Sequence, residues 1–181
     1  MVRIKHRYIL FEVLYPPSNP NHEEFVKFSE TQEDALLTLH QASPSSINAR
    51  LIISTIRKSI QEHYGEHGVG AAGLSINMKY WSNKTSTGII RCDRESFQIV
   101  VGAITLINRF ESNPVIIRCT HISGTIHKCE EYSIRRSKEL IRLINNSALR
   151  TKGKQSSQFL LSLEESTSLK ISDDDRIEID G

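Results

Sequence analysis

Positively charged side chains alternate with aromatic rings in two parts of this sequence, and this mixture is its strongest chemical signal. Near the start the chain reads RIKHRY, and further on Lys79 is followed by Tyr80 and Trp81. Cations bind phosphate groups and flat rings stack on unpaired bases, so the pattern favours contact with structured or single-stranded RNA over reading of duplex DNA. Either ring can equally belong to the hydrophobic core. The basic residues of these parts are Arg3, Lys5, Arg7, Lys79, Lys84, Arg91 and Arg94.

A second basic group lies in the stretch that predicts the last helix. Three of its members repeat every seven residues, which places them on one stripe of a helix. Glu131 and Glu139 lie near this stripe and can pair with Arg135 at the four-residue spacing. A solvated, self-paired helix face is therefore an alternative to RNA contact here. The basic residues of the stretch are Lys128, Arg135, Arg136, Lys138 and Arg142.

The segment GVGAAG at residues 68–73 matches the G-x-G-x-x-G pattern of dinucleotide-binding proteins. In those proteins the glycines follow a strand and open a helix, whose N-terminus binds the pyrophosphate. Here a predicted helix precedes the glycines and a strand follows them. We therefore expect a helix C-cap and a flexible connection at this point.

Cys119, His121, His127 and Cys129 form a C-x-H and an H-x-C pair that could offer soft ligands to zinc. The spacing of two to four residues between the cysteines of structural zinc sites is absent, so we expect ordinary half-buried residues and no bound metal or cofactor. Nothing near the thiols marks a general base or an oxyanion hole, and no carboxylate pair or triad stands in a recognisable motif. The sequence predicts no catalytic residues.

The charge of the chain is divided unevenly. The 181 residues carry a net charge of +2, but residues 1–158 have 21 basic against 14 acidic side chains and residues 159–181 have 2 against 7. Within residues 76–154 the count is 14 against 6, a net +8. This asymmetry indicates a surface for a polyanion and an acidic tail, although a solvated surface with a disordered end gives the same composition.

Two further features exclude whole classes of protein. The longest mostly apolar stretch, residues 97–107, is far shorter than the roughly 18 apolar residues that a membrane-spanning helix needs. The three cysteines are too few for a disulfide framework, which predicts reduced thiols and an intracellular protein.

Hydrophobic periodicity predicts the elements that must position the basic residues. Residues 7–15 are apolar on both faces of an extended chain, so this strand is covered on both sides. A helix capped by Ser45 or Ser46 begins near residue 47, and Asp93 is the expected N-cap of a later helix. The remaining expected elements are a hairpin of strands at 74–82 and 89–92, the helix at 97–107, a strand at 115–126 and a helix at 128–146, with a short helix at 33–40.

This order predicts an α+β fold, the split βαβ sandwich of ferredoxin-like and RNA-recognition-motif-like (RRM-like) domains. Two helices would pack on one face of a four-stranded antiparallel sheet, and the additional C-terminal helix can cover the other face. The predicted domain comprises residues 1–150, with a surface insertion at 18–46. Residues 151–181 are expected to be an acidic, disordered tail.

Three segments resemble one known family: MVRIKHRYILFEVLYPP at residues 1–17, KYWSNKTSTGIIRC at 79–92 and SGTIHKCEEYSIRR at 123–136. The family is that of the fifth processing-of-precursor protein, a small subunit shared by eukaryotic ribonuclease P and ribonuclease MRP, with archaeal relatives. The similarity is strongest to fungal members and covers roughly residues 1–150. Together the three segments are far more specific than any one of them.

The resemblance implies a noncatalytic subunit in the nucleus, including the nucleolus. In these particles the RNA is the catalyst and is expected to hold Mg²⁺; ribonuclease P trims the 5′ leader of precursor tRNA, and ribonuclease MRP processes precursor rRNA. The implied partners are the ribonuclease P and MRP RNAs, a TIM-barrel-like protein subunit and another small subunit, with precursor tRNA nearby and no membrane. The protein would stabilise the RNA by lowering repulsion between packed phosphates.

The resemblance also ranks the candidate RNA contacts. The first choices are the basic N-terminus and the turn of the hairpin, and the second are Arg135 and Arg136, which have acidic neighbours. A different class of function stays open: a protein-only scaffold that joins other subunits without touching RNA. The full candidate set is Arg3, Lys5, Arg7, Lys79, Tyr80, Lys84, Thr85, Arg91, Lys128, Arg135 and Arg136.

Overall fold

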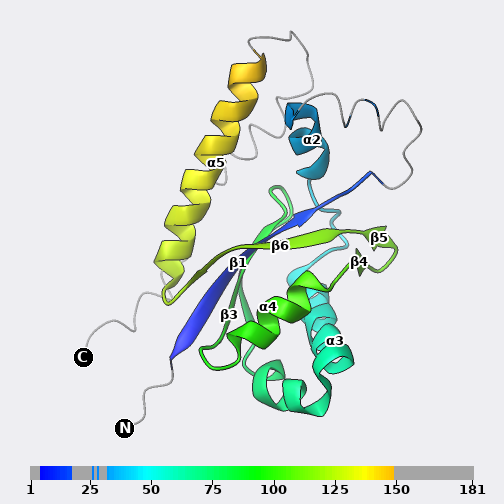
Figure 1. Cartoon of the computed structure of the whole chain (residues 1–181), viewed down its shortest axis with the longest axis vertical. Helices are drawn as coiled ribbons and strands as arrows, with labels where there is room; N and C mark the ends of the chain where they lie inside the picture. Colours follow the sequence, from blue (N-terminus) through cyan, green and yellow to red (C-terminus); the bar gives the residue numbers. More distant parts are fainter. Residues whose placement is uncertain (1–4, 18–25, 27, 29–31, 149–181) are drawn as a thin grey trace.

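In the computed structural model, a four-stranded antiparallel sheet carries helices on both of its faces (Figure 1). The structure describes residues 5–17, 26, 28 and 32–148. The strand order is β2-β3-β1-β6, which confirms the predicted α+β architecture. In chain order the elements are β1 (His6–Leu14), α2 (Gln32–Leu39), α3 (Ala49–Gly68), the π-helical turn η1 (Val69–Gly73), β2 (Asn77–Ser82), β3 (Thr87–Asp93), α4 (Phe97–Thr105), β4 (Arg109–Phe110), β5 (Asn113–Pro114), β6 (Ile116–Ser123) and α5 (Ile126–Ala148).

The central strand β1 is buried on both faces, as its sequence predicted. Ile9, Phe11 and Val13 point toward α3 and α4 and are at most 1% exposed. The ring of Phe11 stacks on Trp81 with centroids 6.0 Å apart. Gly88 lies opposite Phe11 in β3, where a Cβ atom would be 2.5 Å from the ring. Only glycine lets the aromatic ring lie this close to the neighbouring strand.

The last helix, α5, covers the second face of the sheet, as expected for the additional C-terminal helix (Figure 1). It lies over the half of that face formed by β1 and β6. Leu10, Ile89 and Cys129 form a buried cluster between helix and sheet. The half-buried residues packed against this cluster are Tyr8, Tyr80, Ile126 and Tyr132.

Two helix starts differ from the predictions. Asn48, and not Ser45 or Ser46, caps α3: its Oδ1 accepts a 2.9 Å hydrogen bond from the backbone N–H of Leu51. Asp93 is the last residue of β3, and α4 is preceded by Ser96. In both cases the sequence offers several residues suited to capping within a few positions, so local rules do not single out the one at the helix end.

The glycine-rich segment after α3 is a folded turn and not the flexible connection that was expected. The helix is kinked at Gly65, whose φ of 60° and ψ of −158° are not helical, and η1 follows directly after Gly68. Gly68 is buried, and a Cβ there would meet Tyr64 and Ile60. The glycines therefore permit close packing at the end of the helix, which local sequence rules did not indicate.

The described part of the predicted insertion is attached to the sheet by hydrogen bonds. The hydroxyl of Tyr15 donates to Ser43 Oγ over 2.7 Å, and Ser43 in turn donates to Ser86 Oγ over 2.9 Å. Ser86 also reaches the carbonyl of Gln41. The helix α2 lies against α5 (Figure 1). These contacts join the segment before α3 to the β2–β3 turn.

A short hairpin of β4 and β5, two residues each, precedes β6 and was not predicted. Phe110 in β4 is fully buried and belongs to the same core as Phe11. Strands of two residues leave too little periodicity to detect in sequence. Among the described helices, none has the length and apolar character needed to cross a bilayer.

Candidate nucleic-acid interface

Several predicted basic residues gather where β1 begins. Lys5 is exposed just before this strand, and the half-buried Arg91 of β3 lies opposite Tyr8 in the strand register. Arg7 is half-buried, and its Nη1 donates a 3.3 Å hydrogen bond to the carbonyl of the preceding residue. Arg3 lies outside the described residues.

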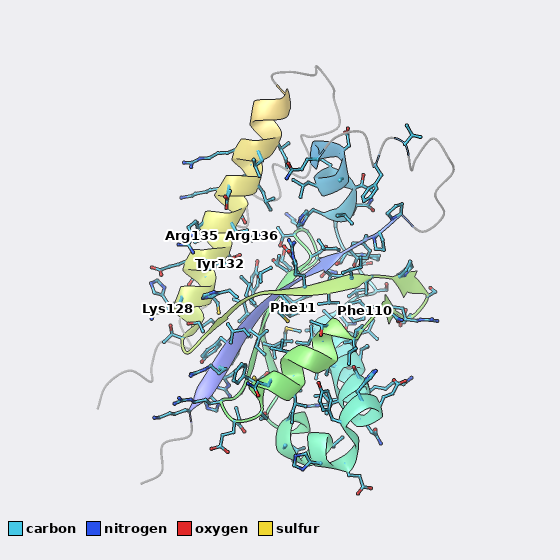
Figure 2. The ribbon with its side chains drawn as sticks, viewed as in Figure 1. Phe11, Phe110, Lys128, Tyr132, Arg135 and Arg136 are labelled. Carbon is cyan, nitrogen blue, oxygen red and sulfur yellow. The ribbon has the colours of Figure 1, made fainter. Side chains whose placement is uncertain are left out.

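The first turn of α5 adds another cation at this end of the sheet. The Sγ of Cys129 donates a 3.5 Å hydrogen bond to the carbonyl of Tyr8, which fixes the start of the helix beside the start of β1. The neighbouring Lys128 is exposed. Figure 2 shows Lys128 near the lower end of α5, below Tyr132 and Arg135.

The β2–β3 turn, the first-choice contact of the hairpin, is held by the loop before α3. The amide of Asn83 donates to the carbonyls of Pro44 and Ile47 over 2.9 and 2.8 Å. Lys84 is exposed next to it, whereas Thr85 is buried and its hydroxyl lies 2.7 Å from that of Thr87. The turn therefore presents Lys84 to solvent, while the hydroxyl of Thr85 is bonded within the chain.

The turn and the basic residues at the start of β1 lie at different ends of the sheet. The backbone N–H of Val13 donates to the carbonyl of Ser86, whereas Arg91 lies opposite Tyr8. Five residues of strand separate Tyr8 from Val13, which corresponds to about 17 Å at ~3.3 Å per residue. The predicted contacts therefore form two separate groups on the described surface.

The aromatic rings of β2 pack into the interior, in agreement with the alternative that they belong to the hydrophobic core. Trp81 stacks on Phe11, and its Nε1 donates a 3.2 Å hydrogen bond to the carbonyl of Ile47. Tyr80 packs against the cluster beneath α5. Both rings and the side chain of Lys79 are half-buried. Because α5 covers much of the sheet face on which Tyr80 lies, that face does not offer the open stacking platform of single-strand-binding proteins.

Along α5 the basic residues divide between two sides of the helix. Arg136 points inward toward the sheet and is half-buried. Glu131 and Glu139 are exposed on the outer side. The exposed cations of the helix are Lys128, Arg135, Lys138 and Arg142.

Arg135 does not make the ion pair with Glu131 or Glu139 that its spacing suggested. Its guanidinium lies 5.3 Å from the ring centroid of Tyr132, a cation–π contact. Tyr132 is stacked on His121 of β6, with centroids 4.6 Å apart and planes 6° from parallel. Glu131 instead lies 3.3 Å from His127. The positive charge of Arg135 therefore lies against an aromatic stack, and no carboxylate of the described residues neutralises it.

A buried carboxylate joins the sheet to α5, and sequence reasoning missed its role. Glu12 lies in the middle of β1 and is only 4% exposed. It forms ion pairs with Arg118, directly opposite in β6, and with Arg136, whose Nη2 is 3.3 Å from Oε1. We call these three residues the Glu12 cluster. The detectable signal was an acidic residue inside an otherwise apolar strand, since a buried charge needs a partner.

His40, just after α2, is buried close to the Glu12 cluster. Burial lowers the pKa of this imidazole below its usual value, and the guanidinium groups of Arg118 and Arg136 act in the same direction, against an opposing effect of Glu12. The imidazole therefore stays neutral near pH 7, and the cluster keeps a net charge of +1.

The three thiols are poorly suited to nucleophilic chemistry. Burial raises the pKa of Cys92 to about 12 and those of Cys119 and Cys129 to about 11. The reactive form is the thiolate, which is scarce at neutral pH in such surroundings. Within the described part of the chain, no three His, Cys, Asp or Glu side chains are grouped so that they could hold a metal ion.

The fold and this surface define a class of protein: a small RRM-like α+β domain in which a C-terminal helix packs on part of the second sheet face and cations remain around its rim. The chain belongs to the Rpp14/Pop5 family, whose model matches residues 7–134. The family resemblance of the sequence is thereby confirmed.

Two fungal relatives are similar over most of their length. The Saccharomyces cerevisiae protein "Ribonuclease P/MRP protein subunit POP5" is 39% identical over 148 residues, covering 81% of this chain and 83% of the relative. The Schizosaccharomyces pombe protein of the same name is 39% identical over 145 residues, covering 80% and 94%. A chain in the cryo-EM structure of yeast ribonuclease MRP matches with a TM-score of 0.41 and 11% identity, over 69% of this chain and 78% of that one.

Proposed function

We propose that this chain is a noncatalytic protein subunit of ribonuclease P and ribonuclease MRP that binds and stabilises their catalytic RNA. The observation that carries the proposal is the 39% identity to two fungal proteins named as subunits of these enzymes. The exposed cations at the start of β1, at the β2–β3 turn and along α5 support it, because RNA affinity comes mainly from phosphate contacts.

The proposed contacts are electrostatic. Lys5 and Lys128 are exposed at one end of the sheet, with Arg91 half-buried nearby, and Lys84 is exposed at the other end. Since α5 closes much of the second sheet face, we assign the RNA to the rim of the sheet and the outer side of α5. The positive side chains would lower repulsion between neighbouring RNA strands and so hold the RNA in its active shape. Bond cleavage and Mg²⁺ belong to the RNA in this proposal.

The proposal includes the partners, the cellular location and the substrates of the assembled particles. The partners are the ribonuclease P and MRP RNAs, a TIM-barrel-like protein subunit and another small subunit, with precursor tRNA close by. The location is the nucleus, including the nucleolus. Precursor tRNA and precursor rRNA are the substrates of the assembled particles, and the chain contributes no reacting group of its own.

The test is to recover the tagged full-length chain from nuclear extract and to sequence the RNA that accompanies it. We expect the ribonuclease P and MRP RNAs to be strongly enriched over an untagged control. Recovery of the intact chain without either RNA overturns the proposal. Ultraviolet crosslinking in the same extract then locates the contacts on the chain.

One observation favours a second candidate, a protein-only scaffold. Leu74, just after η1, is 89% exposed, the largest exposed fraction among the large apolar side chains of the described residues. A scaffold would use such residues to bind partner subunits in a salt-insensitive way. It predicts assembly at high salt and no crosslink from this chain to RNA, whereas the leading proposal predicts crosslinks and strong salt dependence.

A further inference from the structure

We propose that the Glu12 cluster is a phosphate-binding site, in which Arg118 and Arg136 together grip one backbone phosphate of the RNA. This inference rests on the proposed function and identifies a contact, Arg118, that neither the basic sequence patterns nor the family resemblance indicated. Glu12 acts in it as a positioning residue for the two guanidinium groups.

The carboxylate of Glu12 is buried, whereas the two guanidinium groups that bind it reach the surface. The side chain of Glu12 is 5% exposed, whereas those of Arg118 and Arg136 are 48% and 28% exposed. Arg118 comes from the edge strand β6 and Arg136 from the middle of α5, so the two guanidinium groups meet where the helix crosses the sheet. Arg136 lies on α5 in Figure 2. A ligand can approach the cations from solvent without reaching the carboxylate.

The charges of the cluster are not balanced internally. Two guanidinium groups share the single Oε1 atom of one carboxylate, which leaves a net charge of +1. The titratable group packed nearest to them, His40, is buried and stays neutral at pH 7. Within the described part of the chain one negative charge is therefore missing, and a phosphodiester carries one negative charge.

Hydrogen-bond donors are also left over. The Nε atom of Arg136 is buried and has no acceptor in the described part of the chain. An unsatisfied buried donor is costly, and native proteins rarely leave one without a partner. A phosphate oxygen at the seam between β6 and α5 would accept from this guanidinium after a small side-chain adjustment. Arginine, with its planar fork of donors, is the side chain best suited to bind phosphate through two hydrogen bonds.

A phosphate fits this site better than an acidic peptide. A neighbouring stack of His121, Tyr132 and Arg135 lies one helical turn away on the same seam. Its outermost group is an exposed guanidinium, which can lie flat against an unpaired base. A phosphate-binding site beside a stacking surface suits a nucleotide, which has both a phosphate and a base. A carboxylate side chain would use only the first of the two.

The experiment is phosphate-ethylation interference with the full-length chain and transcribed ribonuclease P RNA. In wild-type protein, ethylation of the gripped phosphate should block binding. In Arg118→Gln, interference at that phosphate should disappear and the affinity should fall about 5- to 30-fold. The slope of log affinity against log salt concentration, the salt slope, should drop in magnitude by about one unit. The matched control is Arg50→Gln, which removes the same charge from an exposed site at the start of α3, and should leave all three readouts unchanged.

Two further variants separate RNA contact from folding. Glu12→Gln combined with Arg118→Gln removes the buried carboxylate together with one of its partners, and the same phosphate should lose its interference. Arg118→Lys keeps the charge but not the fork, so the salt slope should be retained while the affinity falls several-fold. Thermal unfolding without RNA shows how much stability each variant loses.

The outcomes are distinct. If wild-type protein binds the RNA and Arg118→Gln keeps both the interference pattern and the salt slope, the cluster only attaches α5 to the sheet and the inference is wrong. The inference is equally wrong if Arg118→Gln leaves RNA binding intact but weakens a protein partner, because the ligand is then an acidic protein surface. If the wild-type chain binds no RNA, the proposed function falls, and the phosphate site with it.

Discussion

Arg136 in α5 donates a 3.3 Å hydrogen bond to Glu12 in β1, across 124 residues of sequence. Arg118 of β6 binds the same Oε1 atom, so the carboxylate connects the last helix to two strands of the sheet. The helix in turn closes the face on which other RRM-like domains stack bases. This buried carboxylate thus helps to hold the helix over that face.

Replacing Glu12 by Ala should destabilise the domain by about 2–4 kcal/mol, because the half-buried guanidinium of Arg136 and the exposed one of Arg118 lose their shared partner. Urea unfolding followed by circular dichroism measures the change. The control is Glu62→Ala on the exposed side of α3, which should shift the free energy of unfolding by less than about 0.5 kcal/mol. Equal effects of the two substitutions would contradict a structural role for Glu12.

Gly88→Ala should cost about 1–3 kcal/mol, because the new methyl group would lie 2.5 Å from the ring of Phe11. Thermal unfolding of this variant is compared with that of Gly70→Ala, where no atom lies within 4 Å of the added carbon. Combining Gly88→Ala with Phe11→Leu should recover part of the loss. If the two single glycine variants unfold at the same temperature, the proposed close approach is refuted.

Lys84→Ala and Arg91→Ala should each weaken RNA binding and reduce the salt slope by about one unit. Since the two residues lie at different ends of the sheet, their effects should add in the double variant. Thr85→Ala is the contrasting variant. Because the hydroxyl of Thr85 is buried and hydrogen-bonded to that of Thr87, the Thr85→Ala variant should lose about 1 kcal/mol of stability and keep the wild-type salt slope. An unchanged slope in Lys84→Ala would remove that residue from the contact set.

The buried thiols predict a loss of stability at alkaline pH. Their folded-state pKa values, about 12 for Cys92 and about 11 for the other two, lie above the ordinary value of 9.0. Folding therefore favours the protonated thiol, and this contribution is complete below pH 9 and lost as the pH rises from about 9 to 11–12. Urea midpoints at pH 8 and pH 10.5 measure the loss, which should be smaller in Cys92→Ala. A midpoint difference identical to wild type in that variant would contradict the prediction.

The same thiols should react slowly with iodoacetamide in the native protein at pH 7.5. Unfolding in urea should increase the rate many-fold, because the thiols then recover their ordinary pKa and become accessible. Rapid labelling of any one of the three cysteines in the folded chain would show that its burial is incomplete.

Hydrophobic periodicity was sufficient to predict the architecture. Apolar residues on both sides of β1 required layers above and below the sheet, and the spacing of the apolar residues of α3 and α4 supplied one of them. The predictions that failed concern features that depend on contacts between distant parts of the chain. The start of α3 follows Ile47, whose carbonyl accepts hydrogen bonds from Trp81 and Asn83, 34 and 36 residues further along the chain.

The candidate site was predictable only in part, for the same reason. The exposure of Lys84 and Lys128 follows from their charge, and the structure places both at the surface. Burial of Thr85 could not be read locally, because the loop that covers it begins some 40 residues earlier. The pairing of Glu12 with Arg118 and Arg136 spans 106 and 124 residues, and no local pattern encodes such partners.

The place of β1 in the sheet has a consequence for biosynthesis. This strand leaves the ribosome well before its two neighbours, β3 and β6, have been translated. Until then the nascent chain exposes a segment of nine residues, six of which are buried in the finished fold, with both hydrogen-bonding edges open. The sheet can therefore form only after β6 has been translated, and pairings between strands far apart in sequence form slowly. Until β3 and β6 pair with it, residues 6–14 are therefore a segment open to association with other extended chains.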